Sequence, residues 1–452
     1  MAAETKQSVV FENMDGKPVC FEFTAPEQTS DAGVILLKAI DGKMDLTGQM
    51  AKAVRDPRDP SKVAHTVEAM LRERVLAIAC GYPDANDAAR LGLDPAMRLV
   101  CGRLGGGLAS QPTLSRFENA ATPAEMLRMA YALTDAVLDR EARKRKGRAA
   151  RRITVDMDST EDRAHGQQQS AFYNGYYDAW CLLPMITTVQ FGDEAEHCAV
   201  APMLRPGNAP GSAGALAILK RLLPRLRKRF PDAKIRVRMD GAFATPEVFK
   251  WLEAGRVDFA VNMPKNDVLK ALAEPLMEIA RARSALSGAT ETVFGEVRYR
   301  ARTWGAERRV IVKAEVTRLP GKDPRDNPRF VVTNLRYTPR NAYKFYAKRG
   351  DAENRIKELK DGLRFDLTSC TRFCANQFRE LLTMAAYALI QQLRCEARGT
   401  DCARAQTTTL RERLLKVGAV VRERARRILF EAPRAYPWYE TWRLVAARVG
   451  AT

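Results

Sequence analysis

Histidine is scarce in this sequence, which has only three histidines among its 452 residues. Zinc sites are built from closely spaced cysteines and histidines, whereas the nine cysteines here are scattered and odd in number. Cys370 and Cys374 are spaced for one helix face, but no second pair follows them. The sequence therefore predicts neither a zinc site nor a disulfide framework, and we expect the cysteines to be reduced cytosolic thiols.

Long apolar runs are missing as well. No stretch approaches the roughly 18 uninterrupted apolar residues of a membrane-spanning helix, and the polar segment Met1–Val9 lacks the apolar core of a secretory signal. We therefore expect a cytoplasmic protein without a membrane partner. Hydrophobic residues still make up 46% of the chain, which is enough for large cores. At roughly 100–200 residues per domain, the length predicts two to four folded domains.

Acidic residues are outnumbered: 54 Asp and Glu stand against 74 Lys and Arg, a formal charge of +20. Such a charge attracts polyanions, and nucleic acid is the commonest partner of a basic soluble protein. The alternative is a basic ribosome-associated or merely soluble protein. One basic run either holds phosphates or is a solvated helix end. It comprises Arg143, Lys144, Arg145, Lys146, Arg148, Arg151 and Arg152.

The N-terminal third of the chain has mostly helical periodicity. Residues 8–23 are an exception and predict a hairpin around the turn Asp15-Gly16. Helical segments are expected at His65–Cys80, Leu108–Phe117 and Pro123–Leu138. The second of these is either a DNA-reading helix or a buried connector.

From residue 153 onward, strands alternate with helices, which indicates an α/β domain. The expected strands are Ile153–Asp158, Tyr177–Val189, Cys198–Leu204, Ile235–Asp240 and Val257–Val261, and the expected helices are Ser212–Phe230 and Pro246–Glu253. Residues 286–334 look β-rich, with strands at Phe294–Arg302, Arg309–Val316 and Phe330–Asn334. The remainder is expected to be helical, first over Asn341–Leu363 and later over the apolar segment Phe378–Leu393.

Three acidic residues stand where metal chemistry would need them. Asp158 ends the first strand of the α/β domain, Asp240 ends a later strand, and Glu353 lies on a late helix. Strand-end carboxylates can converge at one edge of a sheet, and hard cations such as Mg²⁺ remove their mutual repulsion. Taken singly, each acid also has an ordinary explanation: a turn cap, the start of a β-turn, or a surface ion pair of Glu353 with Lys357.

The surroundings of Glu353 favour the catalytic interpretation. Tyr346, Arg349, Glu353 and Lys360 follow the pattern Y-x2-R-x3-E-x6-K. On one continuous helix these four positions form a single stripe. The cations of such a stripe can hold phosphates, the tyrosine can donate a hydrogen bond, and the glutamate can bind metal. The pattern therefore suits a helix that lies beside a phosphodiester.

With this signature, the chain resembles bacterial insertion-sequence transposases of the DDE class, in the cut-and-paste group that forms DNA hairpins. Further segments resemble one branch of that group, so that the resemblance spans nearly the whole chain. They are Arg72–Asp87, Asp156–Asp162, His165–Gln169, Tyr173–Asp178, Arg238–Phe243, Asn327–Asn334 and Asn376-Gln377. The resemblance implies an enzyme that cleaves element ends and joins the 3′-OH to target DNA by two-metal hydrolysis and transesterification, through a hairpin intermediate.

The fold implied by the resemblance is α/β: an RNase H-like catalytic core with a β-rich insertion, flanked by helical N- and C-terminal regions. The expected divisions are a helical DNA-end-binding region at 1–150, the first part of the core at 151–262, the insertion at 263–338, the core helix with the catalytic Glu at 339–372, and a helical C-terminal region for partner contacts at 373–452. The expected partners are double-stranded DNA, as terminal inverted repeats and as target, and a second copy in a synaptic homodimer. The expected location is the bacterial nucleoid in the cytoplasm.

The resemblance also implies the metal ligands. Asp158, Asp240 and Glu353 would hold Mg²⁺, for which Mn²⁺ can substitute. Asp156 faces the same side of its strand as Asp158 and is the reserve for the first ligand. A hydrolytic nuclease without strand transfer and a catalytically silent DNA-binding derivative are the alternative functions.

DNA contacts are expected from Tyr346, Arg349, Lys360, Trp304 and His165. Trp304 would stack on a flipped base, or else it belongs to the core of the insertion, with Tyr299 as the next aromatic candidate. His165 would approach the scissile phosphate, or else it forms hydrogen bonds within its loop. The polar run Gln167–Gln169 either contacts bases or belongs to the same loop.

Overall fold

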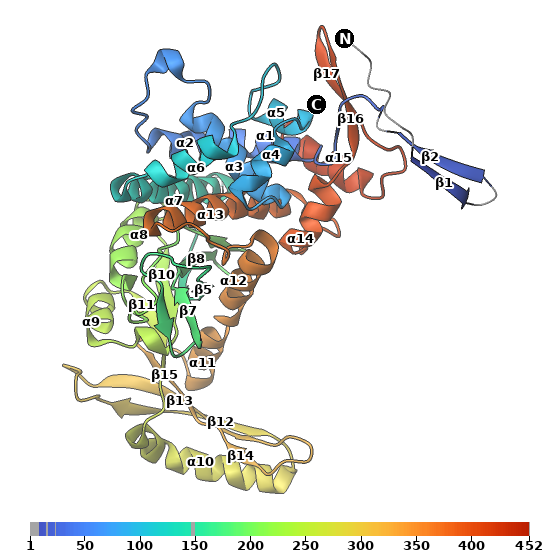
Figure 1. Ribbon diagram of the computed structural model, residues 1–452. Coiled ribbons are helices and arrows are strands. Elements are labelled where there is room, and N and C mark those ends of the chain that lie inside the picture. Colours follow the sequence, from blue (N-terminus) through green and yellow to red (C-terminus); the bar gives the residue numbers. More distant parts are fainter. Residues whose placement is uncertain (1–8, 15–16, 23, 146–149, 452) are drawn as a thin grey trace.

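The computed structural model describes residues 9–14, 17–22, 24–145 and 150–451. Within these residues, a nine-stranded mixed sheet forms the centre of the molecule and a layer of helices lies across one end of it (Figure 1). The chain is thus a mixed α/β protein, as expected. The predicted turn at Asp15-Gly16 and the part of the basic run at 146–149 lie outside the described residues.

Three parallel strands form the middle of the sheet, with β10 between β4 and β11. Their bounds are β4 (Arg152–Ser159), β10 (Lys234–Met239) and β11 (Asp258–Met263). Parallel neighbours need a crossover connection, and α8 (Ala215–Arg229) and α9 (Pro246–Ala254) supply one before and one after β10. These elements lie where the alternating pattern of the sequence predicts them.

Antiparallel strands extend this centre on both sides. On one side are β8 (Met185–Phe191) and β9 (His197–Ala199), and on the other are β15 (Arg329–Thr333), β13 (Arg308–Thr317) and β12 (Glu291–Tyr299), with β14 (Arg325–Asp326) paired to β13. β15 pairs directly with β11, so the expected β-rich insertion continues the main sheet. A long helix that the sequence analysis did not predict, α10 (Asp267–Ser287), precedes these strands and packs against β12 and β13 (Figure 1).

A small sheet follows the end of β4. It has the order β5-β7-β6, with β5 (Asp162–Arg163), β6 (Phe172–Asn174) and β7 (Ala179–Leu182). The single strand predicted over Tyr177–Val189 is divided into β7 and β8 at Leu183-Pro184. A proline cannot donate a ladder hydrogen bond, so it separates the two strands.

The helical layer is built around α13 (Phe373–Glu396), which contacts α1, α3, α6 and α7. The N-terminal helices are α1 (Val34–Met44), α2 (Leu46–Lys52), α3 (Val67–Cys80), α4 (Ala88–Leu91), α5 (Pro95–Val100), α6 (Gln111–Ala120) and α7 (Pro123–Arg145), with short 3-10 turns at Pro60–Lys62 and Ala85–Asp87. The apolar segment Phe378–Leu393 therefore lies in the core of the layer. None of the helices in the described part of the chain combines the length and hydropathy that crossing a bilayer requires.

The late helix expected over Asn341–Leu363 is two helices, so the prediction of one continuous helix is wrong. They are α11 (Pro339–Ala347) and α12 (Gly350–Leu363). Lys348 and Arg349 form a turn between them. Gly350, a poor helix former, begins the second helix. The Y-R-E-K residues therefore do not lie on one straight stripe.

The expectation that the whole C-terminal remainder is helical is also wrong. After α14 (Thr407–Leu410) and the π-helical turn Arg411–Leu415, the chain forms the hairpin β16 (Ala419–Arg424) and β17 (Arg427–Glu431), and then ends in α15 (Tyr439–Arg448). β16 pairs with β3 (Gln28–Thr29), a strand near the other end of the chain. The predicted N-terminal hairpin is present as β1 (Val9–Met14) and β2 (Lys17–Phe21).

The junction between the two ends is close enough to require a glycine. The Gly33 amide donates to the Leu415 carbonyl at 3.1 Å. A Cβ atom on Gly33 would lie 1.8 Å from the Leu414 carbonyl oxygen. Gly33 has helical φ and ψ of −67° and −10°, so its lack of a side chain matters here, and its conformational freedom does not.

We predict that Gly33→Ala destabilises the protein by more than about 3 kcal/mol, because neither backbone can yield without breaking the junction. The matched control is Gly42→Ala, also near α1, where nothing lies within 4 Å of the added Cβ. That exposed helical change should stabilise by about 0.5–1 kcal/mol. Thermal melting of the two variants beside the parent measures both, and equal melting temperatures would contradict the junction.

Candidate active site

A buried ion pair joins the two strands that carry the aspartates. Arg238 on β10 and Asp156 on β4 are direct neighbours in the parallel register. The Arg238 guanidinium donates to both carboxylate oxygens of Asp156, at 2.7 and 2.8 Å, and both side chains are almost fully buried. A third bond runs from Arg238 to the Phe345 carbonyl of α11 at 3.0 Å. One guanidinium therefore connects β4, β10 and α11.

This pair separates the roles of the two candidate acids on β4. Both oxygens of Asp156 accept from Arg238, and His197 Nδ1 lies 3.5 Å from one of them. Asp158, two residues later, lies at the end of the strand with a side chain that is 14% exposed. The geometry thus favours Asp158 over Asp156 as the residue that faces a substrate.

Asp158 and Asp240 lie side by side where β4 and β10 end. Asp240 directly follows β10 and caps the short 3-10 turn Gly241–Phe243, with its Oδ1 accepting from the Ala242 amide at 2.9 Å. Burial raises the pKa of Asp158 to about 6; the Arg349 guanidinium acts in the opposite direction and the nearby Asp240 carboxylate adds to the rise. Two close carboxylates, one of them poorly solvated, form a site that favours a bound cation.

Arg349 connects this pair to Glu353. It lies in the turn between α11 and α12 and donates to Asp158 Oδ2 at 2.7 Å and to Glu353 Oε1. Burial disfavours its charge, but Asp158, Tyr346 and Glu353 outweigh this effect and raise the pKa of Arg349. The Arg349 guanidinium therefore lies between two acids that come from distant parts of the chain.

The other two signature residues lie on either side of this centre. Tyr346 is half-buried, and burial raises the pKa of its hydroxyl, while Arg349 beside it acts in the opposite direction. Lys360 Nζ lies 3.1 Å from Glu161 Oε1, which follows β4. The structure thus places Tyr346 and Arg349 beside the aspartates, pairs Glu353 with Arg349, and ties Lys360 to the segment that follows β4.

The other predicted contact residues are not brought to this centre. Trp304 is 3% exposed and packs edge-on against Phe249 and Tyr299. Tyr299 is itself buried, at 8% exposed. Trp304 therefore occupies the core position that was the alternative to base stacking, and Tyr299, the next aromatic candidate, is buried beside it. Base stacking by Trp304 stays a prediction and would require the side chain to leave this packing.

His165 lies in an exposed loop, where its backbone amide donates to the Gln168 side chain at 2.8 Å. Gln168 is buried and donates to the carbonyls of Thr368 and Cys370. The amide of Gln169 donates to the Thr371 carbonyl at 2.8 Å. The run Gln167–Gln169 is therefore anchored to the segment before α13, which supports the loop interpretation for two of its three glutamines.

Two arginines that position the site were not predicted from the sequence. Arg238 belongs to the segment Arg238–Phe243 that resembles the family, but no role was predicted for it. Arginines at alternate positions of an otherwise apolar strand, Arg236 and Arg238, could have indicated a buried ion pair. Arg205 is buried and donates to the Leu183, Pro210 and Gly211 carbonyls and to Ser159 Oγ, beside Asp158. Nothing in the sequence around Arg205 distinguishes it from a surface arginine.

Comparison with known proteins decides the family. The model of the transposase DDE domain, group 1, matches residues 11–452, which is nearly the whole chain. The chain belongs to this DDE transposase family. Comparison with curated proteins finds no match. Family membership indicates an enzyme that acts on DNA, and DDE transposases generally use divalent metal ions.

The residues of this transposase fit a divalent metal ion in part. Asp158 and Asp240 offer the hard oxygen ligands that Mg²⁺ prefers. In the described residues, no three His, Cys, Asp or Glu side chains are already grouped as a metal site. Glu353 is 55% exposed and paired with Arg349. Bringing Glu353 to the two aspartates therefore requires that ion pair to rearrange.

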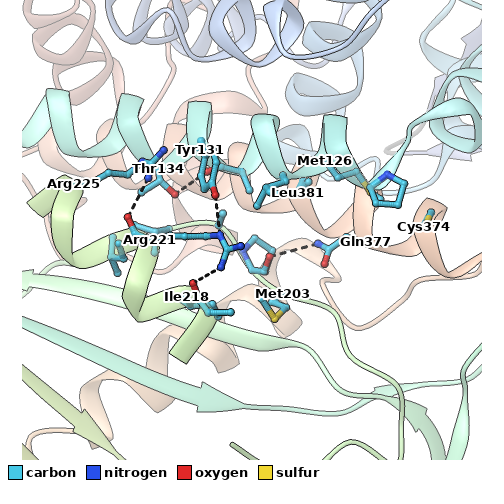
Figure 2. A pocket seen from close by; sticks show the side chains of 18 of the residues that line it. Met126, Tyr131, Thr134, Met203, Ile218, Arg221, Arg225, Cys374, Gln377 and Leu381 are labelled. Carbon is cyan, nitrogen blue, oxygen red and sulfur yellow. Dashed lines mark hydrogen bonds between the residues drawn. The ribbon is translucent and has the colours of Figure 1, made fainter. Parts of the chain in front are cut away.

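An apolar pocket of about 420 Å³ lies elsewhere in the transposase, between α7, α8 and α13 (Figure 2). At its edge the Arg221 guanidinium donates to Tyr131 Oη at 2.8 Å, and Arg225 lies over the Tyr131 ring at 3.9 Å. None of the three candidate acids lines this pocket. It is therefore separate from the candidate active site.

We predict that the two conservative changes on β4 differ strongly in their effect on stability. Asp156→Asn leaves the buried Arg238 without its counter-charge and should cost about 3–5 kcal/mol of folding stability. Asp158→Asn loses one ion pair but also relieves a buried charge, so its melting temperature should stay near that of the parent. Mg²⁺ should raise the melting temperature of the parent and have little effect on Asp158→Asn. A large loss of stability in Asp158→Asn alone would reverse the assignment of the two acids.

Proposed function

We propose that this DDE transposase cuts the ends of its own mobile element and joins the 3′-OH to target DNA, with Asp158, Asp240 and Glu353 holding Mg²⁺ or Mn²⁺. The observation that carries the proposal is that Asp158 lies beside Asp240 at the ends of two parallel strands and shares the Arg349 guanidinium with Glu353. Paired divalent ions, when bound, activate the attacking oxygen and stabilise the leaving one.

We further propose that the core is RNase H-like. The strand order β9-β8-β4-β10-β11 supports this, since an antiparallel meander is followed by two strands parallel to its first member. Both aspartates then lie at the centre of the sheet, where the parallel neighbours β4 and β10 end at the same edge. The helix that carries Glu353, α12, packs against β4.

Side chains near the aspartates can bind the negative charge of the DNA phosphates. A phosphate that approaches Asp158 meets the Arg349 guanidinium, which can exchange a carboxylate partner for a phosphate oxygen, since both accept bidentate donation. This exchange would free Glu353 from Arg349. Lys360 is placed to hold a neighbouring phosphate, and Tyr346 to donate a hydrogen bond. Binding of DNA and assembly of the three acids would thus be coupled.

The remaining parts of the proposal concern partners. We propose that the helical region at 1–150 binds the terminal inverted repeats, that a homodimer forms the synaptic complex, and that residues 373–452 carry partner contacts. A charge of +20 supports DNA binding by the chain. Because α13 is buried in the helical layer, partner contacts by the last region would come from the elements that follow it.

Cleavage should depend on each acid while DNA binding does not. Asp240→Asn and Glu353→Gln each remove a ligand charge with little change of shape, so cutting of element-end DNA should be lost with Mg²⁺ present. Asp351→Asn is the control, since Asp351 is an exposed acid in the first turn of the same helix. Gel assays of cutting and of binding measure the two properties. Normal cutting by Glu353→Gln would remove Glu353 from the site.

The reaction products distinguish the proposed function from its alternatives. Incubation with element ends, target DNA and Mg²⁺ should give hairpin ends on a denaturing gel and then joined strands. Cut ends without joined strands would indicate a nuclease. Bound DNA without any cut would indicate a silent derivative. Joined strands without hairpins would keep the transposase and exclude the hairpin route.

A further inference from the structure

Exposed aromatic side chains gather on the small sheet beside the candidate active site. Phe172, Tyr173, Tyr176 and Trp180 are 42, 53, 88 and 62% exposed. They belong to β6, β7 and the turn between them, residues 172–182, which we name the aromatic hairpin. Large apolar surface is normally buried, so such a group on one short hairpin indicates a binding surface.

The aromatic hairpin is held firmly in place. Tyr173 and Trp180 are cross-strand neighbours with ring centroids 6.4 Å apart, and the Tyr173 hydroxyl donates to Asp178. Asn174 Nδ2 donates to the Gly207 carbonyl at 2.8 Å. A Cβ on Gly207 would lie 2.0 Å from the Cys181 carbonyl oxygen, so this loop lies directly against β7. The rings are therefore presented in a fixed arrangement, which lowers the entropic cost of binding.

The aromatic hairpin also lies next to the two aspartates. Tyr177 lies in the turn of the hairpin, and its hydroxyl donates to the carbonyl of Ser159, the residue after Asp158, at 3.5 Å. Burial raises the pKa of Tyr177, and the charges of Glu161, Asp158 and Asp240 add to the rise. The exposed ring of Tyr176 lies 4.8 Å from that of Tyr177. A continuous path thus leads from the carboxylates to the exposed rings.

We infer that the aromatic hairpin binds unpaired bases of a DNA strand next to the bond that is cut. This inference rests on the proposed function, because the carboxylates fix where the strand must pass. Aromatic rings stack on any base without sequence preference, and a basic chain holds the backbone. Arg163 on β5 is exposed beside the hairpin and can contact a phosphate. A second protein copy on the hairpin would instead cover the approach to Asp158 and Asp240.

The aromatic hairpin is a different surface from the one at Trp304, where base stacking was expected. Trp304 and Tyr299 lie in the core between α9 and the extended sheet, at 3 and 8% exposure. The hairpin rings, by contrast, need no rearrangement to meet a base. The segment Tyr173–Asp178, which resembled one branch of the family without a known role, thus acquires a function in single-strand binding.

Intrinsic fluorescence can test the inference directly, because Trp180 is the exposed one among five tryptophans, all of them within the described residues. Oligothymidylate, titrated without metal, should quench part of the emission of the parent, and this part should be missing in Trp180→Leu. Tyr176→Ala combined with Trp180→Ala should weaken oligothymidylate binding about tenfold to a hundredfold. Duplex binding should change far less. The matched control is Tyr439→Ala, which removes a ring that is 54% exposed on α15.

Unchanged oligothymidylate affinity in the folded double variant would overturn the inference. The inference would also be overturned if the double variant lost self-association in sedimentation but still bound oligothymidylate, since the hairpin would then join copies of the chain. Because the titration contains no metal, its outcome does not depend on cleavage. The two proposals can also fail separately. If the double variant loses oligothymidylate binding but the parent cuts no element-end DNA, the aromatic hairpin is still a single-strand-binding surface and the proposed function is overturned.

Discussion

The arrangement of the candidate active site depends on the buried pair of Arg238 and Asp156. The two residues are neighbours across parallel strands, and two of the three candidate metal ligands, Asp158 and Asp240, lie two residues further along the chain from them. The third bond of Arg238, to the Phe345 carbonyl, fixes the helix that leads to Arg349. A buried ion pair of this kind contributes little net stability, but its bidentate geometry specifies register. One guanidinium thereby aligns three segments that are far apart in the sequence.

Charge balance explains why an arginine stands among the acids. Asp158 is poorly solvated and close to Asp240, which makes a second negative charge costly. The Arg349 guanidinium lowers that cost by contacting Asp158 and Glu353 together. Glu353 is paired with Arg349 in this way and is not grouped with the two aspartates as a metal site in the described residues. We infer that a phosphodiester, as a competing partner of Arg349, couples substrate entry to the completion of the site.

Regular local patterns made much of the fold predictable. β4, β10 and β11 follow alternating apolar residues, and α3, α7 and α8 follow helical periodicity. The failures occurred where long-range contacts outweigh local preference. Arg349, in the turn between α11 and α12, is paired with Asp158 from a distant strand, and β16 pairs with β3 from the other end of the chain as well as with its neighbour β17. Periodicity reports neither kind of contact.

The candidate site could be proposed from the sequence at the level of its acids and their signature. The strand ends placed Asp158 and Asp240, and the spacing around Glu353 carried the family resemblance. The choice between Asp156 and Asp158 could not be made from alternation alone, because both face one side of β4 and only a three-dimensional partner separates them. The burial of Trp304 was equally hidden, since it results from Phe249 and Tyr299 in other elements.

The position of α13 has a consequence for how the chain folds during synthesis. This helix is the centre of the helical layer, yet it comes more than 200 residues after the N-terminal helices that surround it, since α7 ends at Arg145 and α13 begins at Phe373. Such contacts give a high contact order and delay folding. The N-terminal helices contact one another, but the apolar faces that α13 covers have no partner until α13 is synthesised. An incomplete chain therefore lacks the central helix of this layer, and the transposase can complete the layer only near the end of translation.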